Sequence, residues 1–517
     1  PATRIGSSLG IPLVLLGMVF TWRPLIMVGI VLYALVALFQ LLTLPVEFNA
    51  SRRALQTIEN NQFLTEQEYR GAKKVLTAAA LTYVAALASA LATCCGCCSW
   101  QDEAMTVKSP RLAAFETLYK IQQESAYSNL SLDHLPVANG QERAFATALV
   151  RGVLERQITL DALVDKFTTG RLKPKVRVLL RMGAYQALYM DKVPVPAAVN
   201  ETVELAKAVG QGYYGRMINA VLRQIAADPD LPDTPMLRYS VPQPLLAMWQ
   251  KTYGADVTAA FLPYINGRAP LFLVPNPLFV TPGQLQEMLA NEGVQARLLP
   301  EKVLTVDDGF DVERSAAFQK GYFHVQDLSC YLACAALQVR PGLTVLDVCA
   351  APGGKSFTLA EQMNNTGRLI ACDLHPHRVE LIRSGARRLH LDCIESRVQD
   401  ATLHSRDIPA ADAILCDVPC SGFGILRRKP EIRYKDLDSI KDLPALQLPI
   451  LQTAATYLKP GGRLVYSTCT LHKKENEKVV AAFLDRHSAF FLAAECTRFP
   501  CEQGSDGFYY AALERQA

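Results

Sequence analysis

The chain has 517 residues, of which 50% are hydrophobic and 20% are charged, and its formal net charge is +4. This length accommodates roughly three or four domains. The near balance of charge excludes a protein that attracts polyanions through its overall charge, so any basic surface must be local. Most of the 14 cysteines are scattered, and Cys372 and Cys416 lie in apolar runs. This pattern indicates reduced thiols and a cytoplasmic protein rather than a disulfide framework.

Two apolar runs lie in the first hundred residues. The run at 25–45 is close to the roughly 20 residues that a membrane-spanning helix needs, and the run at 75–95 is weaker. The chain begins at Pro1 without a basic start or a cleavage pattern, so we predict no secretory signal and expect the true N-terminus to lie upstream. Any membrane contact is expected only through residues 10–95.

The same segment carries a family likeness. The phrases "LPVEFNASRRAL" and "GAKKVLTAAALTYVAA" resemble the C-terminal portion of small membrane-bound neutral zinc metallopeptidases, over about residues 10–93. Such enzymes need an HExxH helix, whose two histidines hold zinc while the glutamate activates water. No histidine precedes His134. The resemblance therefore implies a truncated metallopeptidase-like segment at 1–98, without peptidase activity.

The stretch "CCGCCSWQDEA", residues 94–104, separates this segment from the rest of the chain. Its cysteines satisfy a C-x-x-C spacing twice, but no second cysteine pair or histidine lies nearby, so we predict no metal site. Palmitoylation of cysteines beside a membrane is an alternative. The favoured interpretation is a gene fusion or read-through between neighbouring genes, with residues 99–104 as the junction.

Residues 105–230 have the pattern of soluble amphipathic helices. In "VRVLLRMGAYQALYM", apolar residues recur at helical spacing and define one buried stripe. Basic residues gather beside it and could form either a phosphate-binding face or a solvated helix face: Arg171, Lys173, Lys175, Arg177 and Arg181. The segments "RLAAFETLYKI", "ERAFATALVRGVLER" and "GRMINAVLRQI" resemble the all-helical RNA-binding domain shared with the antitermination factor NusB. That likeness favours the RNA-binding interpretation.

Residues 231–320 are predicted to form a linker and a small α/β module. The phrase "DPDLPDTP" is typical of a linker, and "APLFLVPNPLFVTPGQLQEMLANEGVQARLLP" predicts a strand, a helix and a further strand.

The C-terminal part predicts a nucleotide-type parallel sheet. "GLTVLDVCAAPGGKSFTLAEQM" predicts a buried strand, a glycine turn and a helix whose N-terminus offers free N–H groups. A P-loop is not expected, because Cys349 stands where that motif needs glycine. Successive predicted strands end at Asp373, Asp400, Asp417 and Cys469. Polar residues at consecutive strand ends indicate a site along one edge of a doubly wound sheet.

Three motifs in this part resemble those of RNA cytosine-C5 methyltransferases: "DVCAAPGGKS", "DVPCSGFGILRRKPEIRY" and "YSTCTLHKKENEKVV". With the helical domain in front, residues 105–517 resemble the bacterial Sun/Fmu-type small-subunit ribosomal RNA methyltransferases. The resemblance implies a multidomain, monomeric protein with a NusB-like domain at 105–230, the small module at 231–320 and a Rossmann-like methyltransferase domain at 321–517. It also implies S-adenosylmethionine as cofactor and ribosomal RNA as partner.

The chemistry of C5 methylation explains why cysteines stand at strand ends. Cytosine C5 is a poor nucleophile until a thiolate adds at C6; C5 then takes the methyl group, a base removes the C5 proton and the thiolate leaves. Cys420 and Cys469 both stand where a nucleophile could act, and spacing does not choose between them. The family resemblance assigns the nucleophile to Cys469 and product release to Cys420.

The resemblance also implies roles for the other motif residues. Asp417 would contact the base or the cofactor, Lys355 would orient Asp417 and the target, and Asp373 would bind ribose. Asp400 would lie on the adenine side, with Arg378 as a weaker cofactor candidate. The methionine part of the cofactor would lie on the loop formed by Cys349, Ala350, Ala351, Pro352, Gly353, Gly354 and Lys355. Phosphate contacts are predicted for Arg427, Arg428 and Arg433.

Other functions remain as alternatives. An exocyclic amino methyltransferase would use an Asp/Asn-Pro-Pro-aromatic turn, where this chain has "DVPC", and a nicotinamide-dependent reductase would need a full G-x-G-x-x-G. An RNA-binding or assembly factor, or a methyltransferase acting on another RNA, would share the helical domain. The cofactor motifs and the two cysteines favour the methyltransferase.

Overall fold

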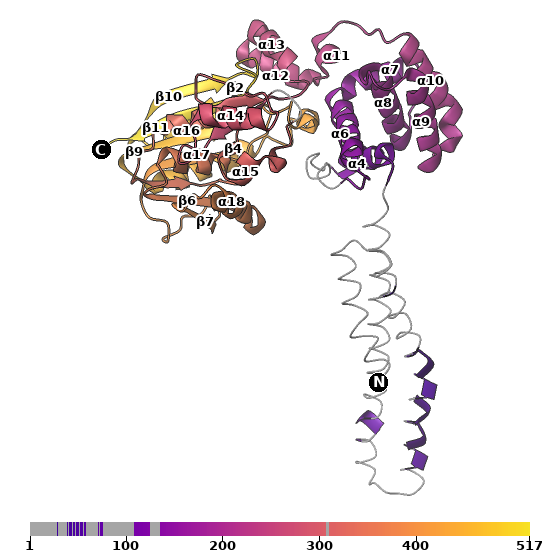
Figure 1. Cartoon of the computed structure of the whole chain (residues 1–517), viewed down its shortest axis with the longest axis horizontal. Helices are drawn as coiled ribbons and strands as arrows, with labels where there is room; N and C mark the ends of the chain where they lie inside the picture. Colours follow the sequence, from indigo (N-terminus) through magenta and orange to yellow (C-terminus); the bar gives the residue numbers. More distant parts are fainter. Residues whose placement is uncertain are drawn as a thin grey trace. The chain divides into compact units, whose positions relative to one another are not determined.

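A computed structural model of the chain describes residues 108–124, 135–306 and 310–517, together with scattered helical positions between 28 and 75 (Figure 1). The chain divides into two compact units, one of residues 1–109 with 136–139 and one of residues 110–135 with 140–517. The cysteine cluster at 94–98 and most of the two apolar runs lie outside the described residues. None of the helices in the described part is long and apolar enough to cross a membrane.

The helical domain begins the second unit, and its helices pack side by side in Figure 1. Its elements are α4 (Pro110–Glu124), α6 (Gly140–Glu155), α7 (Gln157–Lys166), α8 (Pro174–Tyr189), α9 (Val195–Ala208), η1 (Gly212–Tyr214) and α10 (Gly215–Ala227). The predicted stripe of α8 is buried at Val176, Leu179 and Leu180. Gly183 completes it at the contact with α9 and α10, where a Cβ would lie 2.5 Å from a Leu222 methyl and 2.9 Å from Thr202 Oγ1. The absence of a side chain therefore sets the close approach of these helices.

The module after the helical domain contains short helices and a small antiparallel sheet. The helices are α11 (Pro235–Tyr239), α12 (Gln243–Tyr253), α13 (Ala255–Phe261), η2 (Leu262–Tyr264), α14 (Pro282–Asn291), η3 (Val312–Arg314) and α15 (Ala316–Gln319). The strands, in the order β2-β3-β1-β4, are β1 (Leu271–Pro275), β2 (Arg297–Leu298), β3 (Leu304–Val306) and β4 (Phe323–Val325). The predicted strand–helix–strand is β1, α14 and β2. Because β4 pairs with β1, the small sheet extends past the predicted boundary at residue 320.

The catalytic-type domain is built on a sheet with seven strands in the described part of the chain, ordered β10-β11-β9-β8-β5-β6-β7. Its strands are β5 (Thr344–Asp347), β6 (Arg368–Asp373), β7 (Ile394–Val398), β8 (Ala411–Asp417), β9 (Leu458–Thr468), β10 (Phe490–Arg498) and β11 (Phe508–Arg515). The strands from β5 to β9 pair in parallel, and β11 pairs antiparallel with β9. The strand order reverses between β5 and β8, which is where doubly wound sheets open a ligand crevice.

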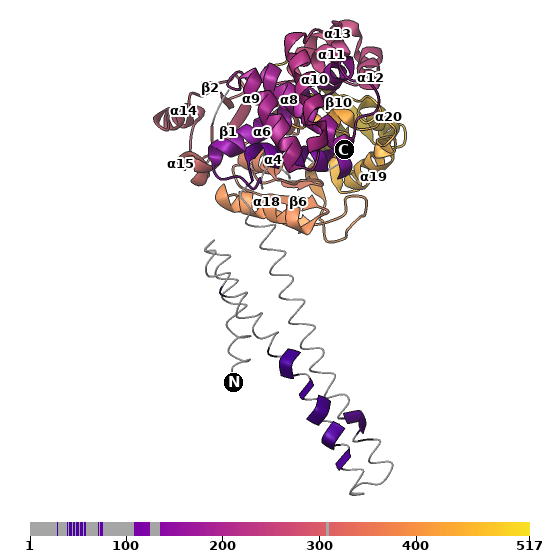
Figure 2. The ribbon, with the colours of Figure 1, turned by 90° about the vertical axis from the view of Figure 1, so that its right-hand side faces the viewer.

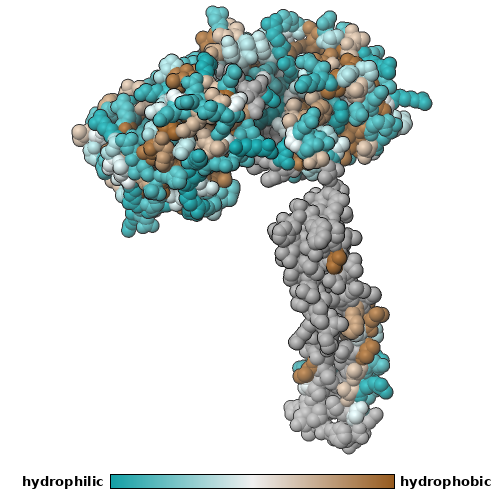
Figure 3. Space-filling model, in the orientation of Figure 1, coloured by the Kyte–Doolittle hydropathy of each residue, from teal (hydrophilic) through white to brown (hydrophobic). Residues whose placement is uncertain are grey.

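Helices cover both faces of this sheet. One face packs against α19 (Leu443–Thr456) and α20 (Glu477–Leu484), which lie side by side in Figure 2. The other face packs against α16 (Leu328–Ala336), α17 (Gly354–Gln362) and α18 (Pro376–Arg388). Cys372 and Cys416 are buried free thiols in the first of these cores, in agreement with the prediction of reduced cysteines. Hydrophilic residues predominate on the face of the second unit seen in Figure 3, with apolar residues scattered among them.

Gly183→Val tests the close helix contact in the helical domain. The larger side chain would overlap Leu222 and Thr202, so we expect the free energy of unfolding to fall by about 1–3 kcal/mol. Thermal denaturation followed by circular dichroism measures the change. The control is Gly140→Ala, because no atom lies within 4 Å of a Cβ added there. Equal melting temperatures for Gly183→Val and the parent chain would contradict this packing.

Candidate active site

The glycine loop between β5 and α17 forms the floor of the crevice. Gly353 has φ +115°, and a Cβ on it would lie 2.4 Å from the Phe357 ring, so only glycine fits. The Ala350 N–H donates to Cys372 O at 2.8 Å, which ties the loop to the neighbouring strand. No side chain caps the N-terminus of α17. Its first N–H groups therefore remain available to a ligand, as predicted for this turn.

The acids at the next strand ends face the same edge. Asp373 is 3% exposed; its Oδ1 accepts from the His375 N–H at 3.1 Å, and its Oδ2 lies 3.4 Å from Arg378 Nη1. Arg378 also donates to Ala351 O at 2.9 Å, so it joins the β6 end to the glycine loop. Asp400, after β7, accepts from the hydroxyl and N–H of Thr402, and these hydrogen bonds hold its pKa below the usual value.

Asp347, at the end of β5, is a further acid at this edge, which the sequence reasoning missed. It is fully buried; Oδ2 accepts from Ser356 Oγ at 2.6 Å, but Oδ1 has no hydrogen-bond partner. Burial raises the pKa of Asp347 to about 7. A buried acceptor without a partner is costly in a folded protein. This orphaned oxygen and the carboxylate of Asp373 fit ammonium and hydroxyl donors, and the free N–H groups of the uncapped helix fit a carboxylate. S-adenosylmethionine carries all three groups.

A charged pair stands beside the glycine loop. Lys355 Nζ lies 2.7 Å from Asp417 Oδ2, and Asp417 Oδ1 accepts from Ser467 Oγ at 2.7 Å. Burial works against the charge on Lys355, but the negative charge of Asp417 outweighs it and raises the pKa of Lys355 well above its ordinary value. The ammonium also lies 5.5 Å from the centre of the Phe508 ring. Lys355 therefore stays protonated and holds Asp417 in one orientation.

The two predicted cysteines meet at the ends of β8 and β9. The Sγ atoms of Cys420 and Cys469 are 3.2 Å apart. The segment after Cys420 packs closely against neighbouring backbone at Gly424, where a Cβ would lie 1.8 Å from Gly507 O. The Gly424 N–H also donates to Cys469 O at 3.0 Å, which links this segment to Cys469. The hydrogen bond with Cys469, together with burial, raises the pKa of Cys420 well above its ordinary value.

A buried carboxylate that the sequence reasoning missed holds the two cysteine segments together. Glu475 Oε2 accepts from the Ser421 N–H at 2.8 Å and from Gln447 Nε2 at 3.0 Å. Its Oε1 accepts from Ser421 Oγ at 2.6 Å and lies 2.8 Å from His472 Nδ1. Burial acts to raise the pKa of Glu475, but the hydrogen bonds from His472 and Ser421 leave it below the ordinary value. Glu475 therefore remains charged and fixes the residue next to Cys420.

The predicted RNA-binding cluster of the helical domain divides into two parts. Arg177 and Arg181 pair with Asp161 at 3.0 and 2.6 Å, and Arg177 also pairs with Asp165 at 2.8 Å. Arg181 is only 6% exposed, so its guanidinium joins α8 to α7 and the predicted phosphate contact is wrong for this residue. Arg171 and Lys173 are exposed, and Lys175 is half-buried.

The second group of arginines predicted to contact RNA phosphate also makes contacts within the protein. Arg428 pairs with Asp506 at 2.6 Å and Asp327 at 3.0 Å, and half-buried Arg427 donates to Gly504 O. Arg433, in η4 (Pro430–Tyr434), is 1% exposed. It donates to five oxygens from distant segments: the carbonyls of Glu155, Tyr239, Ser240 and Ile265, and Oδ1 of Asn266. Its predicted contact with RNA phosphate is therefore wrong, because the side chain joins the helical domain to the catalytic domain.

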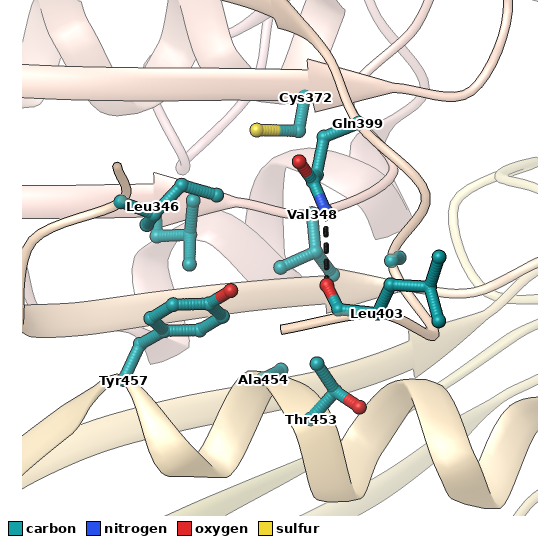
Figure 4. Close-up of a pocket in the computed structure, with 10 residues that line it drawn as sticks. Leu346, Val348, Cys372, Gln399, Leu403, Thr453, Ala454 and Tyr457 are labelled. Atoms are coloured by element: carbon teal, nitrogen blue, oxygen red, sulfur yellow. Dashed lines mark hydrogen bonds between the residues drawn. The ribbon is translucent and has the colours of Figure 1, made fainter. Parts of the chain in front are cut away.

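A small cavity lies on the α19 side of the sheet, where Tyr457, Thr453 and Leu346 face one another (Figure 4). Gln399 Nε2 closes one side by donating to Leu403 O at 2.9 Å. The cavity has a volume of about 10 Å³, enough for one water molecule at most. It is lined mainly by apolar atoms and by neither cysteine of the pair, so it is separate from the candidate site. Within the described residues, no group of His, Cys, Asp or Glu side chains has the arrangement of a metal site.

The sheet and this edge define the class of protein: an S-adenosylmethionine-dependent methyltransferase. Residues 334–514 match the family described as 16S rRNA methyltransferase RsmB/F, residues 108–227 match the NusB family, and residues 1–99 match a neutral zinc metallopeptidase family. The chain is 36% identical to the probable ribosomal RNA small subunit methyltransferase B of Bacillus subtilis, over 75% of this chain and 90% of that protein. It belongs to this family of rRNA methyltransferases, which confirms the resemblance predicted for residues 105–517.

A second relative and a solved structure are also similar to this chain. The ribosomal RNA small subunit methyltransferase B of Thermus thermophilus is 36% identical, over 72% of this chain and 89% of its own length. The crystal structure of PH0851 superposes with a TM-score of 0.68 at 25% identity, and the match covers 80% of this chain and 100% of that one.

Asp347→Asn tests the buried carboxyl. A carboxyl whose pKa is about 7 in the folded chain and about 3.9 in the unfolded chain binds more protons when folded. The stability of the parent chain should therefore fall as the pH rises from about 4 to about 7 and then level off. The amide of Asp347→Asn does not titrate, so we expect the variant to lack this pH dependence. The melting temperature of the variant should therefore rise relative to that of the parent chain between about pH 4 and about pH 7. Parallel melting profiles from pH 4 to 8 would contradict the raised pKa.

Arg433→Ala separates a structural role from a phosphate contact. Removing the guanidinium leaves buried carbonyls without donors, so we expect a loss of about 3 kcal/mol or more in the free energy of unfolding. The slope of RNA affinity against salt concentration, measured below the melting temperature, should not change. A slope reduced by about one charge would show that Arg433 does contact an RNA phosphate.

Proposed function

We propose that this enzyme transfers a methyl group from S-adenosylmethionine to C5 of a cytosine in small-subunit ribosomal RNA, through a covalent adduct between Cys469 and C6. The observation that carries the proposal is the pair of thiols 3.2 Å apart, next to the Lys355–Asp417 pair. Methylation of an exocyclic amino group needs no thiol. Carbon methylation needs a nucleophile and a second group for release, and the crevice edge supplies both.

Cys469 makes the covalent bond. Its thiolate adds to C6, and the electron pair of the C5–C6 double bond moves so that C5 becomes enamine-like. When bound, S-adenosylmethionine supplies an electrophilic methyl group to this carbon. Cys420 has a raised pKa and keeps its proton near neutral pH, so it can donate a hydrogen bond to a neighbouring thiolate. The family resemblance assigns the nucleophile to Cys469.

Release reverses the covalent step. A base takes the C5 proton, and the electron pair of that C–H bond forms the C5–C6 double bond again. The bond from C6 to Sγ of Cys469 breaks, and its electron pair regenerates the thiolate. We assign Cys420 to this step because its Sγ is adjacent to that of Cys469 and the Glu475 hydrogen bonds fix the residue that follows it.

Asp417 and Lys355 prepare the base. The Asp417 carboxyl, held by Lys355 and Ser467, is placed to hydrogen-bond the edge of the pyrimidine, which helps the ring accept the nucleophile. The ammonium of Lys355 supplies positive charge at the same edge. For the cofactor, we assign the loop from Cys349 to Lys355 to the methionine part, Asp373 with Arg378 to ribose, and Asp400 to the adenine side.

The remaining parts follow from this assignment. Residues 105–230 hold the RNA, residues 321–517 carry the chemistry, and the reaction takes place in the cytoplasm. Residues 1–98 take no part in it, and residues 99–104 mark the junction. An assembly factor without catalysis would have no use for the thiol pair and the orphaned acceptor of Asp347.

Cysteine variants test the proposal. Cys469→Ala should reduce methyl transfer to background and abolish covalent trapping on RNA that contains 5-fluorocytosine, because no Sγ reaches C6. Cys420→Ala should form a protein–RNA adduct that accumulates, because release is blocked. Gel shifts under denaturing conditions detect the adduct, and bisulfite sequencing of the RNA detects methylation at C5.

The matched control is Cys496→Ala, a half-buried free thiol on β10, which should leave both measurements unchanged. Loss of trapping in Cys420→Ala, with trapping retained in Cys469→Ala, would reverse the two roles. Methylation at an exocyclic nitrogen would refute the proposed reaction.

A further inference from the structure

Tyr213 is exposed to an unusual degree. Its side chain is 93% exposed, more than any other large hydrophobic residue in the described part of the chain. It lies in η1, between α9 and α10 of the helical domain. Its ring contacts Tyr214 edge-on, with the centres 5.2 Å apart and an interplanar angle of 88°.

The turn that carries Tyr213 is fixed by backbone hydrogen bonds. The Gln211 N–H donates to Ala206 O at 2.7 Å, and the Tyr214 N–H donates to Gln211 O at 3.0 Å. Gly210, with φ +74°, turns the chain out of α9, and Gly215 is buried at the start of α10. The backbone position from which the ring projects into solvent is therefore fixed, which lowers the entropy that the turn loses when a ligand binds.

Basic residues lie near the turn that carries this ring. Lys173 Nζ lies 5.4 Å from the centre of the Tyr214 ring, and Tyr214 meets Tyr213 edge-on, so the three side chains form one cluster. Arg171 and Arg216 are exposed and close in sequence to members of this cluster. In the described part of the chain, neither of them forms an ion pair, and Lys173 forms none either. Arg177 and Arg181, by contrast, pair with Asp161 and Asp165. The cations without an ion pair in the described part of the chain thus include Arg171 and Lys173, just before α8, and Arg216 in α10.

We propose that Tyr213 is a stacking platform for an unpaired base of the RNA substrate, and that Arg171, Lys173 and Arg216 contact the phosphates beside that base. An exposed aromatic face among unpaired cations suits a single-stranded polyanion, because base stacking and phosphate contacts then act together. It suits a protein interface less, since the core of such an interface is depleted in charged residues. The inference rests on the proposed function for the identity of the ligand as RNA.

Binding of the full chain to an unmodified small-subunit rRNA transcript tests the platform. Tyr213→Ala should weaken binding roughly 5- to 150-fold, the loss expected for one base–aromatic stack. Tyr213→Phe should bind within about twofold of the parent, because it keeps the ring. Lys173→Ala should reduce the slope of affinity against salt by about one charge. The matched control is Tyr264→Ala, an aromatic residue 43% exposed in η2, which should bind as the parent does.

Two results would overturn the platform: parental affinity in Tyr213→Ala, or equal weakening in Tyr213→Phe and Tyr213→Ala. The first would indicate a surface used for something other than RNA, such as a protein partner. Bisulfite sequencing of RNA treated with the parent chain keeps the test separate from the proposed function. If the cytosine stays unmethylated and the variants bind as expected, the proposed reaction is refuted and the stacking platform is supported. If C5 is methylated and Tyr213→Ala binds as the parent does, the reaction is supported and the stacking platform is refuted.

Discussion

Everything at the catalytic edge depends on the parallel pairing of β5 with both β6 and β8. Parallel strands end at the same edge of a sheet, and each pair needs a crossover connection that carries the chain back. Strand ends that are far apart in the chain, at Asp347, Asp373, Asp417 and Thr468, are thereby brought to one line. Because the strand order reverses at β5, the helices diverge there and leave room for a ligand. The glycine loop and the thiol pair both lie at this edge.

Buried charge organises the edge in a second way. Asp417 is balanced by Lys355, and Glu475 is balanced by donors from Ser421, Gln447 and His472. A carboxylate that is buried and fully hydrogen-bonded holds its partners in a single arrangement. Asp347 differs, because one of its oxygens lacks a partner. Asp347 is therefore the acid at this edge whose hydrogen bonding we propose that a bound ligand completes.

Arginines illustrate how far local sequence misleads about charge. The run "RRKPEIRY" is basic in the sequence, yet Arg428 lies between Asp327 and Asp506, and Arg433 reaches carbonyls of residues 155 and 265. These partners lie between 78 and 278 residues away along the chain, so no spacing rule could have shown them. The same holds for Glu475, whose neighbours come from three segments. In the helical domain, Arg171 and Lys173 remain exposed while Arg181 is buried, a division that periodicity alone did not show.

The sequence by itself determined the succession of helices, the strand–turn–helix around Gly353, the acids and cysteines at strand ends, and the family to which residues 105–517 belong. These are local features: hydrophobic period, glycine conformation and motif spacing act over a few residues. Only the tertiary structure decided that Cys420 and Cys469 touch, that Asp347 keeps an unpaired oxygen, and which basic residues of the helical domain form ion pairs. Electrostatic and hydrogen-bond partners are chosen by distance in space, and the fold sets that distance between residues remote in the chain.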